Sequence, residues 1–313
     1  PDAIGPAMTE FLANRAGNPG RGGHRLSSLA ADTIDEARAR LADLVGADET
    51  ERLILTHGCT DSVNLSIHAR LRCILQEAPG AKPRVIASCL EHNAVLRTLH
   101  CYEAGGEIEL TIAPCEPDGT VLPETILNLC DDRTVLVCVL HASNALGTIQ
   151  PVGEIGLALA ERWPEALFLV DAAQTAGHAP IDVRRDAIDL LAIAGHKGLL
   201  GPTGTGALYI SPRAWPADEA PRLVCQRRGG TGQIAMGLEM PDTLPDAMEA
   251  GTANTVGFAG LSAAMASHED IDHEHDRRLT ARLLEGLADT PGVTLYGLPT
   301  VDGRTSVVMF NVE

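Results

Sequence analysis

The chain has 313 residues, enough for one large domain or two of ordinary size. Hydrophobic residues make up 45% and charged residues 21%, which is typical of a folded globular protein rather than a disordered one. The formal net charge of −18 argues against binding to nucleic acid or to an anionic membrane surface, because both carry negative charge.

Apolar runs of strand length alternate with helical patterns along most of the chain. We expect strands at Arg52–Thr56, Arg84–Ser88, Ile108–Ala113, Thr134–Leu140, Leu167–Val170, Leu190–Ala194 and Gly206–Ile210. We expect helices at Leu26–Val45, Asp61–Glu77, Ala94–Glu103, Pro123–Leu129 and Val152–Arg162. The alternation predicts an α/β fold, with a mostly parallel seven-stranded sheet and helices on both faces.

The pattern changes after about Asn254. A long helix over Phe258–Leu287 and strands at Val293–Tyr296 and Thr305–Asn311 predict a smaller α+β unit. We therefore expect a large domain over residues 1–257 and the start of a small C-terminal domain over 258–313. One helix and two strands cannot bury a core of their own, so we expect this small domain to be incomplete.

Targeting signals and disulfide patterns are not evident. No apolar run approaches the roughly 20 residues of a membrane-spanning helix, and no signal peptide is visible at the N-terminus. The eight cysteines include no Cys-x-x-Cys pair, and several lie in apolar stretches that favour buried, reduced thiols. These features favour the cytoplasm.

Polar residues follow five of the predicted strands. Any one of them could be an ordinary cap or a solvated loop, but the carboxyl ends of parallel strands meet at one edge of a sheet. The five segments are His57–Asp61, Cys89–Asn93, His141–Thr148, Asp171–Gln174 and Gly195–Gly198. Their convergence predicts a ligand site at this edge.

The residues at these strand ends have the chemistry of a pyridoxal phosphate site. Only two lysines occur in the chain, and Lys197 alone follows a predicted strand, whereas Lys82 precedes a proline in a turn. The cofactor needs a lysine amine for covalent attachment and an acid beside its pyridine nitrogen, a role suited to Asp171. The helix that begins after Cys59 and Thr60 suits the phosphate, and His92 could stack on the ring.

Several segments resemble the class V aminotransferase family of fold-type I pyridoxal phosphate enzymes, in particular its cysteine desulfurase and selenocysteine lyase branch. The most specific segments are Val170–Gly177 and Gly195–Gly206. Further agreement lies in Asn18–His24, Glu91–Ala94, Ala142–Thr148 and Glu249–Thr255. The resemblance covers nearly the whole chain and implies the fold of pyridoxal-phosphate-dependent transferases.

The resemblance also implies roles for individual residues. Lys197 would hold the cofactor and move protons, and His92 would stack on the ring. The other cofactor-binding residues would be Asp171 at the pyridine nitrogen, Gln174 and Asn144 near the ring oxygen, and Cys59, Thr60 and His196 around the phosphate. Thr252 would reach the phosphate of a neighbouring subunit, which implies a homodimer, and His24 would lie near the entrance to the site.

The chain also departs from the family pattern. Ala194 stands where the family usually has a phosphate-binding Ser or Thr, and Cys59 stands where Thr or another small residue is frequent. The family's persulfide-forming cysteine and its carboxylate-binding arginine have no counterpart in this sequence. We expect both to fall after Glu313.

The resemblance implies removal of sulfur from L-cysteine, giving L-alanine and a persulfide that a sulfur-acceptor protein could take up. Alternatives on the same scaffold are an aminotransferase, a selenocysteine lyase or another β-eliminating lyase. A nucleotide-binding protein is disfavoured, because the glycine-rich run Gly201–Gly206 precedes a strand instead of following one. A catalytically inactive binding protein is disfavoured by Lys197 and Asp171.

A metal site is not expected from the sequence. His273 and His275 flank an acidic residue, but alternate residues of a helix point apart, so this pair does not form a chelate. The arginines of the segment 227–232 could contact an anion or could simply lie in a surface loop.

Overall fold

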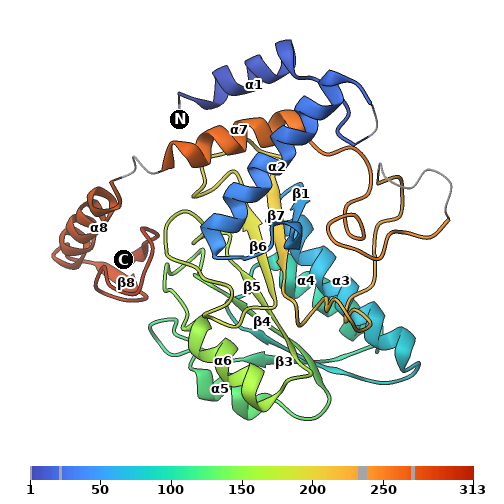
Figure 1. Cartoon of the computed structure of the whole chain (residues 1–313). Coiled ribbons are helices and arrows are strands. Elements are labelled where there is room, and N and C mark those ends of the chain that lie inside the picture. Colours follow the sequence, from blue (N-terminus) through green and yellow to red (C-terminus); the bar gives the residue numbers. More distant parts are fainter. Residues whose placement is uncertain (1, 21–22, 232–237, 269–271) are drawn as a thin grey trace.

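The computed structural model describes residues 2–20, 23–231, 238–268 and 272–313. Its centre is a seven-stranded sheet with the order β1-β7-β6-β5-β4-β2-β3 (Figure 1). The strands are β1 (Leu53–Thr56), β2 (Arg84–Ser88), β3 (Glu109–Ala113), β4 (Thr134–Leu140), β5 (Leu167–Asp171), β6 (Leu190–Ala194) and β7 (Gly206–Ile210). All seven predicted strands are present, within one residue of the expected boundaries.

All neighbouring strands are parallel except the two pairs that involve β7. Because β7 is antiparallel to both β1 and β6, β1 and β6 run in the same direction. The carboxyl ends of six strands therefore lie at one edge of the sheet. The amino end of β7 lies there too, since Gly206 pairs with Thr56 and with Ala194. The predicted mostly parallel sheet is confirmed, and this edge is where open α/β sheets bind ligands.

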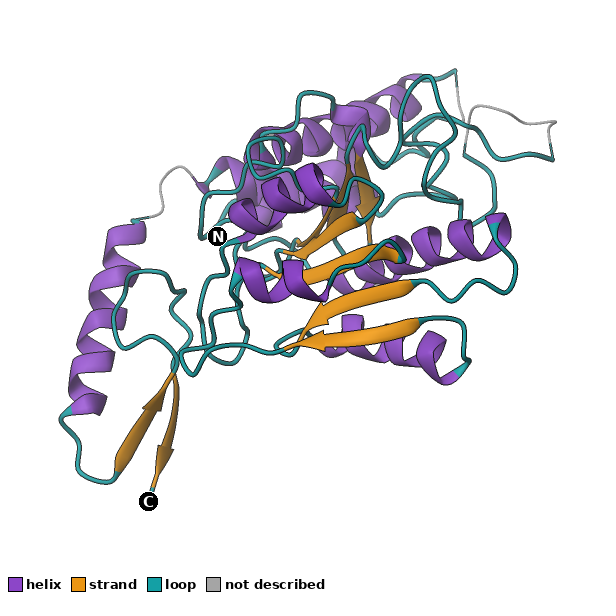
Figure 2. Ribbon diagram, turned by 90° about the horizontal axis from the view of Figure 1, so that it is seen from below, coloured by secondary structure: helices purple, strands orange, loops and turns teal. Residues whose placement is uncertain are grey.

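Helices cover both faces of the sheet, and each face has its own apolar core (Figure 2). One core includes residues of α2 (Arg25–Val45), α5 (Pro123–Leu129), α6 (Val152–Arg162) and α7 (Thr255–Ala266). The other includes residues of α3 (Cys59–Glu77) and α4 (Asn93–Ala104). The central strands read as unbroken apolar runs because they are buried on both sides. A helix that was not predicted, α1 (Ile4–Asn14), packs against α7.

A buried ion pair holds the segment that leads into α7. Arg38 of α2 donates to both carboxylate oxygens of Glu249, with Nη1–Oε1 and Nη2–Oε2 distances of 2.8 and 3.1 Å. The backbone N–H of Leu55 also donates to Oε1 of Glu249, at 2.6 Å. Glu249 thereby links α2 and β1 to the segment that carries Thr252.

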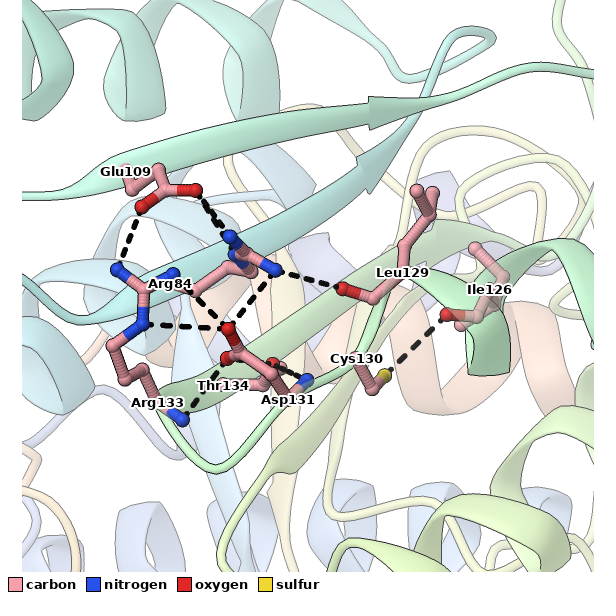
Figure 3. A network of polar contacts seen from close by, with 8 residues as sticks. All are labelled: Arg84, Glu109, Ile126, Leu129, Cys130, Asp131, Arg133 and Thr134. Atoms are coloured by element: carbon pink, nitrogen blue, oxygen red, sulfur yellow. Dashed lines mark hydrogen bonds and ion pairs between the residues drawn. The ribbon is translucent and has the colours of Figure 1, made fainter.

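A second polar network lies at the opposite edge of the sheet, where β2, β3 and β4 begin (Figure 3). Arg84, the first residue of β2, donates to Glu109 at the start of β3 and pairs with Asp131 at 3.0 Å. Arg133 bridges the same two carboxylates, at 2.7 Å from Glu109 and 3.0 Å from Asp131. Because it lies where strands begin, this network fixes strand starts and takes no part in the site at the carboxyl edge.

The C-terminal part differs from its prediction in two respects, the extent of a helix and the start of a strand. The expected single helix over Phe258–Leu287 is wrong, since the described residues form α7, ending at Ala266, and α8 (His273–Ala288). Asp272 caps α8 by accepting a hydrogen bond from the backbone N–H of His275, at 3.1 Å. An Asp at this position is a usual N-cap, but the helical pattern on both sides of Asp272 favoured one continuous helix in the sequence analysis. Residues 269–271 of the predicted helix lie outside the described residues.

Two short strands follow α8, namely β8 (Val293–Tyr296) and β9 (Met309–Val312), and they pair in antiparallel fashion. The second strand was predicted over Thr305–Asn311, which is wrong at its start, because the backbone at Arg304 and Thr305 pairs with residues 147 and 148 instead. With α8 they lie to one side of the main body (Figures 1 and 2). The division into domains over 1–257 and 258–313 stays a prediction. The packing of α7 on α1 and α2 favours a boundary after α7. None of the helices in the described part of the chain has the length and apolarity needed to cross a membrane.

Candidate active site

A cavity of about 650 Å³ lies at the carboxyl edge of the sheet. It is lined by residues from the ends of β1, β2, β4, β5 and β6, and its size is typical of a cofactor or small-molecule site. Of the nine predicted site residues, eight line it: Cys59, Thr60, His92, Asn144, Asp171, Gln174, His196 and Lys197. The convergence of strand ends expected from the sequence is therefore present in the structure.

Asp171 and Lys197 face the cavity from adjacent strands. Asp171 is the last residue of β5, and Lys197 lies three residues beyond the end of β6. The Asp171 side chain is buried, with 8% of the residue exposed, while Lys197 is half-buried. None of the ion pairs found among the described residues includes Asp171. A buried carboxylate with this environment suits a cation that enters the cavity.

Among the described residues, the side chain of Asp171 makes hydrogen bonds through only one of its two carboxylate oxygens. Its Oδ1 accepts from the thiol of Cys59, at 3.1 Å, and from the backbone N–H of Ala173, at 2.9 Å. Burial, with the neighbouring Asp171 charge and the hydrogen bond to it, raises the pKa of the Cys59 thiol well above its ordinary value. Cys59 therefore stays protonated and acts as a donor, and Oδ2 keeps its acceptor capacity.

The amino end of α3, where the sequence predicts the phosphate, lines the cavity. Gly58 precedes the helix, and the first N–H groups of a helix have no partners within it. Gly58 also packs directly on the sheet: a Cβ atom on Gly206 would fall 2.5 Å from the Gly58 Cα atom. Because neither Gly58 nor Gly206 has a side chain, the start of α3, with Thr60, can approach β7 closely.

His92 is held in place by its own helix. It is the N-cap of α4, and its Nδ1 accepts a hydrogen bond from the backbone N–H of Ala94, at 3.1 Å. The ring is exposed toward the cavity that it lines. The acceptor role of Nδ1 fixes the ring orientation, as a stacking role requires.

The loop that carries Asn144 is braced by the C-terminal segment. The backbone N–H of Ile149 donates to the carbonyl of Gly303, and that of Thr305 donates to the carbonyl of Gly147, both at 2.8 Å. The buried Arg304 between them donates to the carbonyl of Leu146, at 3.2 Å. Asn144 therefore lies on a loop whose shape depends on residues far along the chain.

Three residues singled out from the sequence lie away from the lining of this cavity. The Oγ1 of Thr252 lies 3.5 Å from the Oδ1 of Asn18 and faces a separate, smaller pocket. His24 caps α2 by accepting from the backbone N–H of Ser27, at 3.3 Å. Arg227 is paired with Asp61, and Gly232 at the end of its segment lies outside the described residues.

Asn64 is the cavity residue that the sequence reasoning missed. It lies one helical turn after Thr60, and its Nδ2 donates to the Thr60 carbonyl at 2.8 Å. The four-residue spacing would have placed both residues on one face of α3. His57 and Asp61 also line the cavity, and both belonged to the polar strand end that the sequence pointed out.

The residues present fit pyridoxal phosphate. The cavity offers one lysine amine, a buried carboxylate with an acceptor oxygen to spare, and helix N–H groups beside Thr60. These are the groups required by an aldehyde, a protonated ring nitrogen and a phosphate. Ala194 lines the cavity as well, so the hydroxyl usual at that position is missing and the phosphate would depend more on α3.

Comparisons with known proteins agree with this reading. Residues 1–313 match the protein family described as "Aminotransferase class-V". A probable cysteine desulfurase of Halalkalibacterium halodurans is 32% identical over 319 residues, covering 100% of this chain and 75% of that protein. A cysteine desulfurase of Escherichia coli O127:H6 is 34% identical over 322 residues, with the same two coverages. The apo structure of a cysteine desulfurase from Thermococcus onnurineus superposes with a TM-score of 0.88 at 29% identity, covering 100% of this chain and 76% of that one.

Proposed function

Because the chain belongs to the class V aminotransferase family, whose members depend on pyridoxal phosphate, we propose that it is a cysteine desulfurase. The substrate is L-cysteine, and the products are L-alanine and a persulfide. The observation that carries the proposal is the single cavity into which both Asp171 and Lys197 project. Relatives named cysteine desulfurase, which align with the full length of this chain, support the choice of substrate.

Different residues of the cavity would bind different parts of the cofactor. When bound, the cofactor supplies a covalent link to amino groups and a ring that accepts an electron pair from the substrate. The Oδ2 of Asp171 would hold the proton on the pyridine nitrogen, and His92 would stack on the ring. The N–H groups at the start of α3, together with Thr60 and His196, hold the phosphate. Gln174 and Asn144 orient the polar groups at the ring oxygen.

Lys197 acts in both attachment and proton transfer. Its amine would hold the cofactor at rest and would be free once substrate is bound. The free Nζ then takes the proton from the substrate Cα atom and later returns a proton to the product. Over the whole reaction the substrate C–S bond breaks and an S–S bond forms to an accepting thiol. The sulfur atom moves to that thiol, and the carbon skeleton leaves as L-alanine.

Cys59 is unsuited to be the accepting thiol. It is the one cysteine among the described lining residues, and its raised pKa leaves almost no thiolate at neutral pH. We propose that the sulfur is passed to a thiol other than those of this cavity, and that an acceptor protein then takes it. All eight cysteines are free, as expected in a reducing compartment such as the cytoplasm.

We further propose that two copies of the chain form a homodimer in which Thr252 completes the phosphate site of the partner. Thr252 lies outside the cavity of its own chain, which supports a role across an interface. Mixing the inactive variants Lys197→Ala and Thr252→Ala tests this idea. Random mixing rebuilds intact sites in hybrid dimers, and about a quarter of the wild-type activity should return. No recovery would exclude the exchange of Thr252.

Covalent trapping tests the cofactor assignment. The purified chain is incubated with pyridoxal phosphate and reduced with borohydride, and the modified peptide is identified by mass spectrometry. With two lysines in the chain, modification should occur at Lys197 and disappear in Lys197→Ala, whereas Lys82→Ala should behave as the wild type. Modification at Lys82 alone, or at neither lysine, would refute the assignment.

Product analysis then tests the reaction. The loaded enzyme is given L-cysteine and a dithiol that accepts the sulfur, and alanine and sulfide are quantified. Equal amounts of both support the proposal. Pyruvate in place of alanine would indicate a β-eliminating lyase, and amino transfer to an oxo acid would indicate an aminotransferase. A strong preference for L-selenocysteine would indicate a selenocysteine lyase.

A further inference from the structure

We propose that His178, His273 and Asp276 form a binding site for a divalent cation of the zinc type, between the main body and α8. One ligand atom from each residue lies within 4.8 Å of the other two. The residues come from two distant parts of the chain, since His178 follows β5 while His273 and Asp276 lie in the first turns of α8. This site is separate from the cavity and does not rest on the proposed function.

The spacing along α8 explains why the sequence did not suggest this site. Residues three apart on a helix lie on one face, so His273 and Asp276 point the same way, whereas His275 does not share that face. The third ligand comes from the body: the rings of His178 and His273 meet edge to face, with 6.5 Å between their centres. The site therefore exists only when the chain has folded.

The ligand set selects the class of metal. Two imidazoles and one carboxylate suit Zn²⁺ and its neighbours in the first transition row, and they suit Mg²⁺ and Ca²⁺ poorly. Tetrahedral Zn²⁺ with bonds of about 2.0–2.1 Å holds its ligand atoms roughly 3.3 Å apart. The three atoms here must approach by up to about 1.5 Å, which rotation of the exposed His178 and His273 side chains can supply. Water would complete the coordination.

The surroundings hold the body side of the site in position. A Cβ atom on Gly198 would fall 2.6 Å from the ring of His178, so the ring rests directly on this glycine. The Nε2 of His268 donates to the carbonyl oxygen of Gly198, at 2.6 Å, and its ring centre lies 5.9 Å from that of His273. His268 thus packs beside the cluster without being one of its three ligands.

A bound cation would join α8 to the turn that carries the cofactor lysine. Gly198, against which His178 and His268 lie, directly follows Lys197 in the chain. In the metal-bound state the first turn of α8 would be fixed against this turn through His273 and Asp276. The proposed consequence is a metal-dependent gain in stability that the cofactor site alone does not produce.

Calorimetric titration of the cofactor-loaded protein with Zn²⁺ tests the proposal. His178→Ala, His273→Ala and Asp276→Asn should each weaken one binding event at least about tenfold, the loss typical of removing even an outer-shell partner. The matched control is His275→Ala, which changes a histidine on the same helix outside the cluster and should bind as the wild type. Binding of Zn²⁺ to cysteine thiols is common to all variants and cancels in the comparison.

Thermal unfolding provides the second readout. Zn²⁺ should raise the melting temperature of the wild type and of His275→Ala, but not that of His178→Ala, and Mg²⁺ should raise none of them. Equal affinity for Zn²⁺ in the wild type and His178→Ala would overturn the proposal. An equal loss of Zn²⁺ affinity in His275→Ala and His273→Ala would overturn it too. If an alanine variant melts lower without metal, His178→Gln and Asp276→Asn supply the same comparison.

Discussion

The thiol of Cys59 donates a hydrogen bond to the carboxylate of Asp171, with 3.1 Å between Sγ and Oδ1. Together with the backbone N–H of Ala173, this bond occupies Oδ1 and leaves Oδ2 with its acceptor capacity. Cys59 was expected near the phosphate because of its place at the start of α3. The structure gives its side chain a second partner, the acid that would hold the ring nitrogen.

This relationship predicts different outcomes for two substitutions of Cys59. Cys59→Ser keeps a donor and should leave the affinity for pyridoxal phosphate within about twofold, while Cys59→Ala should lower it roughly three- to tenfold, the worth of one hydrogen bond. The affinity is measured by titrating the cofactor and following the absorbance of the bound form. Cys101→Ala, an exposed cysteine on α4, is the control. Identical affinities for Ser and Ala at position 59 would contradict the positioning role.

Glu91 predicts a pH dependence of stability. Burial raises its pKa from 4.5 to about 8, and its Oε1 accepts from Ser88 and from the backbone N–H of Leu140. The folded state therefore keeps a proton that the unfolded state loses above pH 4.5. The contribution of this group to stability falls as the pH rises from 4.5 to about 8 and is level above that.

The variant Glu91→Gln should not show this loss of stability with rising pH. The amide oxygen can still accept both hydrogen bonds, and the side chain no longer titrates. Urea unfolding should give the variant a gain on the order of a few kcal/mol over the wild type at about pH 8, shrinking toward about pH 5. The exposed Glu161→Gln on α6 serves as the control. A constant difference across this range would show that Glu91 does not titrate as described.

The ion pair of Arg38 and Glu249 predicts a large loss of stability. The side chain of Arg38 is 7% exposed and that of Glu249 is 21% exposed, so Arg38→Ala leaves a mostly buried carboxylate without its cation. The free energy of unfolding should fall by about 3 kcal/mol. Arg40→Ala breaks an exposed pair with Glu36 on the same helix and should cost less than about 1 kcal/mol. Equal losses in denaturant unfolding would refute the distinction.

The contact between Gly58 and Gly206 predicts that Gly206→Ala is harmful. The new Cβ atom would fall 2.5 Å from the Gly58 Cα atom and 2.7 Å from the carbonyl of Ile193, and neither is a flexible side chain. The free energy of unfolding should fall by about 1–3 kcal/mol. The affinity for pyridoxal phosphate should also fall, because the start of α3 is pushed away from β7. In Gly286→Ala of α8 nothing lies within 4 Å of the new atom, so stability should hold or rise. Unchanged stability and cofactor affinity in Gly206→Ala would contradict the close packing.

The strands and the cavity were predictable because their signals are local. Strands buried on both faces are unbroken apolar runs, and a parallel sheet brings the residues after Leu140, Asp171 and Ala194 to one edge. The scarcity of lysine then singled out Lys197. Helix α1 was not predictable in the same way, since its packing partner, α7, lies at the other end of the sequence.

Side-chain pairings required the folded arrangement. The hydrogen bond between Cys59 and Asp171 depends on how far the start of α3 reaches over the end of β5, which no spacing in the sequence records. The approach of His178 to His273 depends in the same way on where α8 begins. That start is set by the cap residue Asp272, whose signal competes with a continuous helical pattern around it.

The two backbone hydrogen bonds between the Asn144 loop and the segment around Arg304 give that loop a mechanical role. Any displacement of α8, β8 and β9 relative to the sheet must either stretch these bonds or carry the loop along. Asn144 is thereby coupled to the position of the C-terminal unit. A movement of that unit at the periphery of the molecule would displace the Asn144 amide group in the wall of the cavity.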